Sequence, residues 1–226
     1  MIPLKDDNPT RSWPLVTVGL IIVNVIVFLY QLSLGRGFGA FMFKMGAIPY
    51  ELTRFTDIDP QVAFPLPLTL LTSQFLHGGF LHLIGNMLYL WIFGDNIEDI
   101  MGHFRFFIFY LLCGILAATT HILTNINSEV PMVGASGAIA GVLGAYLVRY
   151  PRAKVSVLFF FFFIIRIIKV PAMFVLGFWI VIQVLSGLGS LNVGGGGVAW
   201  FAHIGGFLAG ILLLKVFERK SYRVYG

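Results

Sequence analysis

The sequence contains few charged residues and almost no cysteine. Only 11% of its 226 residues are charged, whereas 58% are hydrophobic and the mean hydropathy is +0.90. A soluble domain of this length cannot bury so much apolar surface, so the composition excludes a soluble globular protein and indicates a polytopic membrane protein. The single cysteine, Cys113, lies in an apolar run, which excludes a disulfide framework and a cysteine-based metal site.

Several catalytic motifs are also missing. There is no His-Glu-x-x-His sequence, so nothing indicates a metal, and no cofactor is expected. An intramembrane aspartyl protease is excluded because Gly94-Asp95 offers one acid at the end of an apolar run, with no partner Asp in another run. The pI of about 9.5 does not indicate nucleic-acid binding, because most Lys and Arg residues flank apolar runs instead of forming a basic domain.

We expect a single all-α domain over residues 1–226 that crosses the membrane six times. No internal repeat or charge block indicates a second domain, and no signal-peptide cleavage pattern precedes the first apolar run, so this run is expected to remain as a span. The six apolar segments of spanning quality lie near residues 14–34, 78–94, 104–124, 135–149, 171–189 and 198–217.

Two connecting segments have unusual compositions. Residues 35–77 mix aromatic side chains with charges and prolines, and we expect them to lie partly in the outer membrane interface. Residues 155–170 contain an apolar run from Val155 to Ile165 that is too short to cross about 30 Å of hydrocarbon. An interfacial or re-entrant segment on the cytoplasmic side is favoured over a seventh span.

Charge distribution predicts the orientation. An even number of spans places both termini on one side of the membrane, and only Arg36, Lys44 and Arg54 among the basic residues lie on the other side. Because basic residues concentrate in the cytoplasm, both termini are expected there. The residues on the cytoplasmic side are Lys5, Arg11, Arg105, Arg149, Arg152, Lys154, Arg166, Lys169, Lys215, Arg219, Lys220 and Arg223.

Four polar residues fall near the outer ends of alternate spans. His82 and Asn86 lie near the start of the second span, Ser136 near the start of the fourth, and His203 near the start of the sixth. Since these spans enter from the same side, the four side chains are expected at one depth. His82 and Asn86 are four residues apart and share a helix face. Polar groups in hydrocarbon are costly and are candidates for function.

Small residues line the fourth and sixth predicted spans. Ser136, Ala140 and Gly144 share a face of the fourth span, and Gly206 and Gly210 form a GxxxG pattern in the sixth. Such rows let two helices approach closely in a membrane. A close approach is required if a serine and a histidine are to lie within about 2.6–3.2 Å of each other.

Each feature also has a purely structural interpretation. The small residues can serve packing alone, His203 can serve packing or a proton relay, and the polar pair of the second span can join helices. Gln74, His77 and His121 are expected at the interface, solvated and not catalytic. The convergence of four polar groups at one depth favours a nucleophile and its base over these alternatives.

Three motifs, in this order, resemble those of the rhomboid intramembrane serine proteases. They are His77-x4-His82-x3-Asn86 in the second span, Gly134-x-Ser136-Gly137 at the start of the fourth, and Ala202-His203-x-Gly205-Gly206 in the sixth. The resemblance covers most of the chain. It implies a six-helix bundle in which a short central fourth helix carries the serine.

The resemblance also implies the roles of the site residues. Ser136 is expected to be the nucleophile and His203 the general base of a dyad that has no acidic third member. The expected oxyanion hole combines side chains of the second span with backbone N–H groups near the serine, namely those of His82 and Asn86 and those of Ser136 and Ala135. Gly134 is expected to keep the backbone open beside the nucleophile, with Gly137 and His77 in supporting positions.

The sequence departs from the family pattern at two points. Some members carry a tyrosine that packs on the histidine, whereas this chain has Ala140 at that position, so another group must orient His203. The Trp-Arg pair found in the first outer loop of many members is absent from residues 35–77. The fifth span, with Trp179 and Gln183, resembles the more mobile helix of the family, where substrate is thought to enter sideways.

The expected function is hydrolysis of peptide bonds in or near transmembrane segments of membrane-protein substrates. The expected partners are these substrates and the lipid bilayer, without nucleic acid, and the oligomeric state is open. The compact form favours a prokaryotic plasma membrane, with cytoplasmic termini and a site that opens to the outer side. The alternatives are a non-catalytic protein that binds transmembrane helices and a small transporter, which would carry polar groups through the full bilayer depth.

Overall fold

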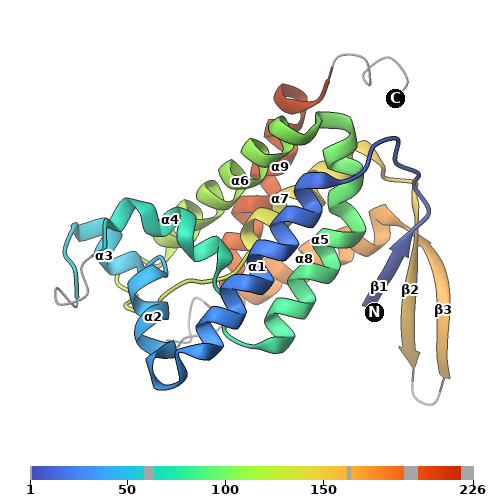
Figure 1. Cartoon of the computed structure of the whole chain (residues 1–226). Coiled ribbons are helices and arrows are strands. Elements are labelled where there is room, and N and C mark those ends of the chain that lie inside the picture. The colour runs from blue at the N-terminus through green and yellow to red at the C-terminus, as the bar shows by residue number, and fades with distance from the viewer. Residues whose placement is uncertain (1, 59–63, 162–163, 191–197, 220–226) are drawn as a thin grey trace.

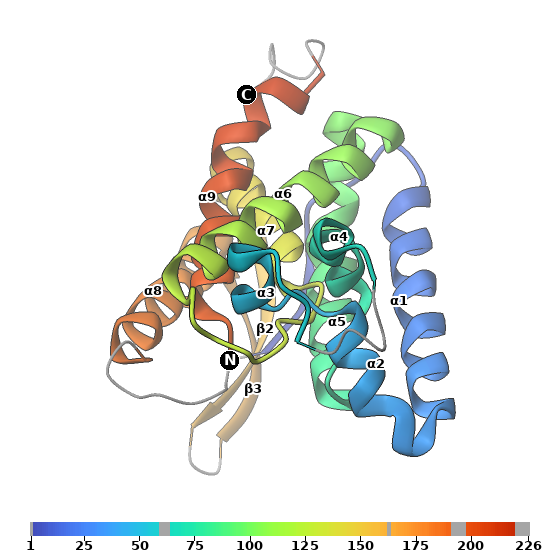
Figure 2. The ribbon, with the colours of Figure 1, turned by 90° about the vertical axis from the view of Figure 1, so that its left-hand side faces the viewer.

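Helices dominate the computed structural model, which describes residues 2–58, 64–161, 164–190 and 198–219. Figures 1 and 2 show the long helices side by side in one bundle, with the short helices gathered on one side of it. The long helices are α1 (Leu15–Ser33), α5 (Phe80–Met101), α6 (His103–Thr124), α7 (Ser136–Arg149), α8 (Ala172–Ser190) and α9 (Trp200–Phe217). The short ones are α2 (Phe38–Met45), α3 (Pro49–Arg54), α4 (Thr69–Thr72) and the 3-10 turns η1 (Gly35–Gly37), η3 (Leu66–Leu68) and η4 (Ser73–Phe75).

Four helices of the described chain are long and apolar enough to cross a membrane, namely α1, α6, α8 and α9. The segment Leu66–Phe75 and α5 meet the same criteria together, although they are bent by 81° at the break between them. The chain is therefore a multi-pass membrane protein. Helix α7 has 14 residues. It rises only about 21 Å at 1.5 Å per residue, which is less than the thickness of the hydrocarbon layer.

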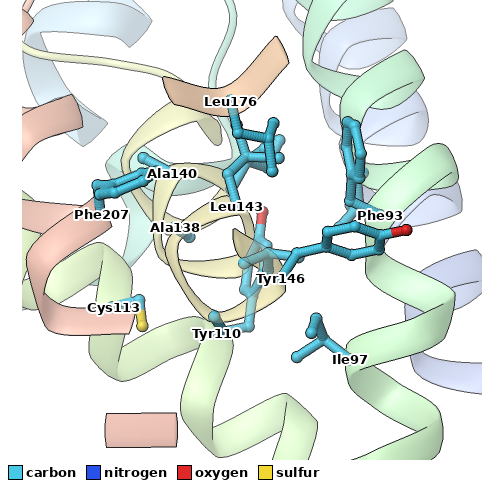
Figure 3. Packing of buried hydrophobic residues seen from close by; sticks show 14 of the residues in the cluster. Phe93, Ile97, Tyr110, Cys113, Ala138, Ala140, Leu143, Tyr146, Leu176 and Phe207 are labelled. Atoms are coloured by element: carbon cyan, nitrogen blue, oxygen red, sulfur yellow. The ribbon is translucent and has the colours of Figure 1, made fainter. Parts of the chain in front are cut away.

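Helix α7 lies inside the bundle. Every residue from Gly137 to Tyr146 is buried, and the helix packs against α5, α6, α8 and α9. Figure 3 shows Tyr146 of α7 between Phe93 of α5 and Tyr110 of α6. The ring centroids of Tyr146 and Phe93 are 4.9 Å apart with an edge-to-face geometry, which is favourable for two aromatic side chains.

Glycines bring α9 directly against α7. A Cβ atom added to Gly206 or Gly210 would overlap the backbone carbonyl groups of Gly137 and Gly141, respectively. Because lipid tails are as apolar as leucine side chains, close van der Waals packing is what holds such helices together in a membrane. The small-residue rows thus place the start of α7 beside the start of α9.

A three-stranded antiparallel sheet lies beside the bundle (Figure 1), and the prediction of an all-α protein omitted it. The sheet contains β1 (Ile2–Asp6), β2 (Lys154–Phe161) and β3 (Ile164–Pro171) in this order. Within residues 155–170, expected to be an interfacial or re-entrant segment, the described residues pair as the antiparallel strands β2 and β3. Val155 and Val157 are fully buried whereas Lys154 is exposed. This alternation is typical of a strand, but the run of Phe and Ile that follows conceals it in the sequence.

The C-terminal end of α5 holds the start of α1. The carboxylate of Glu98 accepts hydrogen bonds from the backbone N–H groups of Val16 (2.8 Å) and Thr17 (2.7 Å), which lack partners within their own helix. Asp99 accepts hydrogen bonds from the backbone N–H and the hydroxyl group of Ser12. The predicted second span ended near residue 94, whereas α5 continues to Met101 because these acidic side chains are paired with the N-terminal chain.

Candidate active site

A cavity of about 1110 Å³ brings the predicted polar residues together. Its walls come from α5, α6, α7, α8, α9 and the segment that leads into α7. The predicted site residues that line it are His82, Asn86, Ser136 and His203. These residues are far apart in the sequence, so the bundle creates their proximity.

Ser136 is the first residue of α7, and its hydroxyl oxygen lies 2.8 Å from Nε2 of His203. The chain enters the helix through Gly134, whose φ of +126° is rarely adopted by residues with a side chain. Ala135 precedes the helix as its N-cap residue and is fully buried. The distance between Ser136 and His203 is that of a nucleophile and its base in contact.

His203 is held from α8 through its second ring nitrogen. Nδ1 of His203 lies 2.7 Å from Oε1 of Gln183. The centroid of the Trp179 ring is 5.8 Å from that of the imidazole with an angle of 37° between the planes, and Trp200 approaches edge-on at 6.3 Å. These residues contact the imidazole of His203, whereas Ala140 has no ring that could do so.

His82 and Asn86 face the cavity from one side of α5, as their spacing predicts. The backbone N–H of Gly78 donates a weak hydrogen bond of 3.4 Å to Nδ1 of His82. This assigns the ring proton to Nε2, which is the nitrogen nearest Gly134. A Cβ atom at Gly134 would lie 2.7 Å from that nitrogen and 3.6 Å from the hydroxyl oxygen of Ser136. A hydrogen-bond donor therefore lies beside the serine.

His77 and Gln74 are buried, so the prediction that they are solvated is wrong. His77 is fully buried, and its Nε2 lies 2.9 Å from Nδ2 of Asn86. Gln74 is 3% exposed and donates a hydrogen bond of 2.9 Å to the carbonyl oxygen of Leu70. Gln74 lies in η4 at the end of the segment before α5, and His77 lies in the break where the chain bends by 81° into α5. His121 is half-buried and lines the cavity.

The remaining predicted residue, Gly137, serves the contact between helices. A Cβ atom there would lie 2.7 Å from the Cβ atom of Ala117 on α6. The contact between Gln183 and His203 was not predicted, and the available signal was a single amide in the otherwise apolar fifth span. Among the described residues, no group of three or more His, Cys, Asp or Glu side chains is arranged to hold a metal ion.

Comparisons with known proteins agree with the motifs. Residues 67–220 match the family profile described as Rhomboid domain. Rhomboid protein 1, mitochondrial, of Saccharomyces cerevisiae is 31% identical over 169 residues, which cover 69% of this chain and 44% of that protein. RHOMBOID-like protein 4 of Arabidopsis thaliana is 36% identical over 147 residues, which cover 64% of this chain and 32% of that protein. Rhomboid protease GluP of Bacillus subtilis is 46% identical over 78 residues, which cover 34% of this chain and 15% of that protein. The matches thus span less than half the length of these relatives.

Proposed function

The chain belongs to the rhomboid family, and on this premise we propose that it is an intramembrane serine endopeptidase. It hydrolyses peptide bonds in or near transmembrane segments of membrane-protein substrates. The observation that carries the proposal is the distance of 2.8 Å between the hydroxyl oxygen of Ser136 and Nε2 of His203, inside a cavity lined by polar groups. One relative, from Bacillus subtilis, is itself named a protease.

In this mechanism, His203 is the general base and Ser136 the nucleophile. Nε2 of His203 takes the hydroxyl proton as the serine oxygen attacks the substrate carbonyl carbon. The same nitrogen then gives the proton to the leaving amine, which leaves an acyl-enzyme ester on Ser136. A water molecule from the cavity, deprotonated by His203, hydrolyses the ester and restores the serine.

The oxyanion of the tetrahedral intermediate is stabilised by donors from two helices. His82 contributes its Nε2–H, and Asn86 contributes its side-chain amide, which His77 positions through their contact at 2.9 Å. The backbone N–H groups of Ser136 and Ala135 lie at the start of α7, where N–H groups lack intrahelical partners and the helix dipole favours negative charge. Each donor of this kind lowers the barrier by about 3–4 kcal/mol.

The substrate is a membrane-spanning helix that unwinds locally before cleavage. The backbone carbonyl groups of a helix are already hydrogen-bonded, so the scissile carbonyl must be released before Ser136 can attack it. Helix-weakening or small residues near the outer membrane surface therefore favour cleavage. Neither nucleic acid nor a cofactor takes part in this reaction.

We propose a single domain with six spans, in which the bent pair and the short α7 each count as one. Both termini then lie on the cytoplasmic side, where most basic residues are found, and the site opens to the opposite side. The relatives do not support the expected prokaryotic plasma membrane. They include mitochondrial proteins of yeast and human as well as a bacterial protein. We propose a multi-pass membrane location with this orientation.

Reconstitution of the full chain with a model single-span substrate in liposomes tests the function. We expect cleavage by the wild-type protein, and a fall of at least about 10³-fold with Ser136→Ala or His203→Ala, since the two residues act as a unit. A fluorophosphonate probe is expected to label Ser136. Ser33→Ala is the matched control, because this exposed serine donates a hydrogen bond to the carbonyl oxygen of Tyr30 in its own helix.

The non-catalytic alternative gives a different result in the same assay. A non-catalytic protein that binds transmembrane helices retains the substrate equally well in the wild type and in Ser136→Ala, with neither cleavage nor labelling. Undiminished cleavage by Ser136→Ala would assign the activity to another residue and overturn the proposal.

A further inference from the structure

We propose that Gln183 is the positioning residue of the general base and that it makes the dyad depend on the seating of α8. The inference rests on the proposed function and names the group that takes the place of an acidic third member. Oε1 of Gln183 lies 2.7 Å from Nδ1 of His203, and the opposite nitrogen of the same ring lies 2.8 Å from the hydroxyl oxygen of Ser136. The imidazole is thus held between these two residues.

The orientation of the Gln183 amide fixes the tautomer of His203. Its Nε2 donates a hydrogen bond of 3.4 Å to the carbonyl oxygen of Trp179, one turn earlier in α8. Reversing the amide would bring two oxygen acceptors together at Trp179, so Oε1 faces the imidazole. An amide oxygen only accepts hydrogen bonds. Nδ1 of His203 must therefore carry the ring proton, which leaves Nε2 free to accept the proton of Ser136.

Both groups that orient the imidazole come from one face of α8. Trp179 and Gln183 are four residues apart in α8. Trp179 places its ring beside the imidazole of His203, and Gln183 accepts a hydrogen bond from Nδ1–H of that imidazole. Gln183 is 5% exposed and His203 is 8% exposed, so little water is available to replace the amide as a partner. These two residues supply the contacts that Ala140, one turn after the serine, cannot make.

Most of α8 faces away from the bundle. Its buried residues are Ala172, Val175, Leu176, Gln183 and Gly187. Its large exposed apolar side chains include Phe174, Phe178, Val181, Leu185 and Leu188. Displacement of α8 from α9 removes the partner of Nδ1, and the imidazole then loses both its tautomer and its orientation. The dyad is therefore assembled only while α8 is seated against α9.

Substitutions at Gln183 test this role. Gln183→Met keeps the length of the side chain but offers no oxygen acceptor, and we expect kcat about 10²-fold lower, as for a misplaced catalytic group, with little change in KM. Gln183→Glu retains an acceptor for Nδ1–H, but its second oxygen faces the carbonyl oxygen of Trp179, so its kcat is expected to lie between those of Gln183→Met and the wild type. Leu185→Ala is the control on the same helix, because this side chain is 64% exposed.

A measurement on the wild-type protein in detergent tests the tautomer without any substrate. Nitrogen NMR of histidine-labelled protein, with the His203 signal assigned by its loss in His203→Asn, is expected to show a neutral ring protonated at Nδ1. Gln183→Met is expected to lose this preference. A ring protonated at Nε2 in the wild type, or wild-type kcat in Gln183→Met, overturns the inference. If the wild-type protein neither cleaves nor labels, the proposed function fails while the tautomer measurement still tests the contact.

Discussion

At the scale of single residues, Gly134 determines how closely Ser136 and His82 approach each other. Its φ is +126°, and a Cβ atom there would lie 2.7 Å from Nε2 of His82. We expect Gly134→Ala to displace the His82 ring and to lower kcat about 10²-fold, which is the typical effect of losing one oxyanion donor. Cleavage rates of a single-span substrate at saturating concentration measure this effect.

The control is Gly39→Ala in α2, because a Cβ atom there meets no heavy atom within 4 Å. This variant is expected to cleave at the wild-type rate. If Gly134→Ala is equally active, His82 is not a donor to the oxyanion.

Asp6 is a buried carboxyl group of β1, outside the membrane-spanning helices. It is 8% exposed and accepts a hydrogen bond of 2.6 Å from the hydroxyl group of Tyr146. Burial raises the pKa of Asp6 above its ordinary value of 3.8, and the hydrogen bond from Tyr146 opposes this effect. Because the folded state then binds the proton more tightly than the unfolded state, stability from this group is greatest at low pH and is lost as the pH rises through the raised pKa.

Asp6→Asn removes this dependence on pH. We expect the Tm of Asp6→Asn, relative to that of the wild type, to increase as the pH rises from about 4 to about 8. Thermal unfolding in detergent at several pH values measures the difference. Asp7→Asn is a control of opposite sign, because the hydrogen bond from Lys169 lowers the pKa of Asp7 and its contribution is instead lost as the pH falls. A difference for Asp6→Asn that does not vary with pH contradicts the assignment.

At the scale of elements, the start of α1 depends on a side chain of α5. Pro14, the N-cap residue of α1, makes no side-chain cap, and Glu98 accepts the N–H groups of Val16 and Thr17 instead. We expect Glu98→Gln to lower the free energy of unfolding by about 1–3 kcal/mol. The substitution replaces one buried carboxylate oxygen by an amide NH2 group, which then faces a backbone N–H of α1. Denaturation in mixed micelles, followed by circular dichroism, measures this change.

The same substitution at the exposed Glu129 is the control for Glu98→Gln and is expected to leave the free energy of unfolding within about 0.5 kcal/mol of the wild type. Equal effects of the two substitutions contradict a capping role for Glu98.

The sequence predicts some elements better than others. Helices lie at each of the predicted apolar segments because burial in lipid leaves a long, continuous apolar signal. Strands β2 and β3 were missed because their Phe and Ile run hides the alternation that Val155 and Val157 follow. The final turns of α5 were missed because Glu98 and Asp99 resemble loop residues until their partners, more than eighty positions away, are known.

The site shows the same contrast. The convergence of Ser136, His203, His82 and Asn86 was predictable because each lies near the N-terminal end of α5, α7 or α9, and the predicted topology makes these three helices enter from the same side. The contact between Gln183 and His203 was not, because it depends on how α8 is rotated about its own axis. The burial of His77 also depends on the bend before α5, which no local pattern of the sequence reveals. The catalytic roles of these residues stay predictions.

At the scale of the whole molecule, the proposed six spans have a direct consequence for chemical labelling. Single cysteines introduced at Lys5, Arg166 and Lys215 are expected to react with a membrane-impermeant maleimide from one face of the bilayer, and a cysteine at Arg36 from the other face. All four positions are exposed. Inside-out and right-side-out vesicles distinguish the two faces.

The wild-type chain is the control for this labelling, because its single cysteine, Cys113, is fully buried. Labelling of Lys5→Cys and Lys215→Cys from opposite faces indicates an odd number of spans. With an odd number of spans, His82, Ser136 and His203 are no longer expected at the same membrane surface.

The pairing of β1 with β2 also sets an order of events during synthesis. Ile2 pairs with Leu158 and Asp6 with Val155, and roughly 150 residues separate the two strands, so a ribosome completes β2 on the order of 10 s after β1. During that interval the helices α1 to α7 are synthesised while the first strand has no partner. The pairing of β1 with β2 is therefore a late step in folding. In a nascent chain that stalls before residue 154, the edge of β1 that would pair with β2 stays accessible to chaperones and proteases.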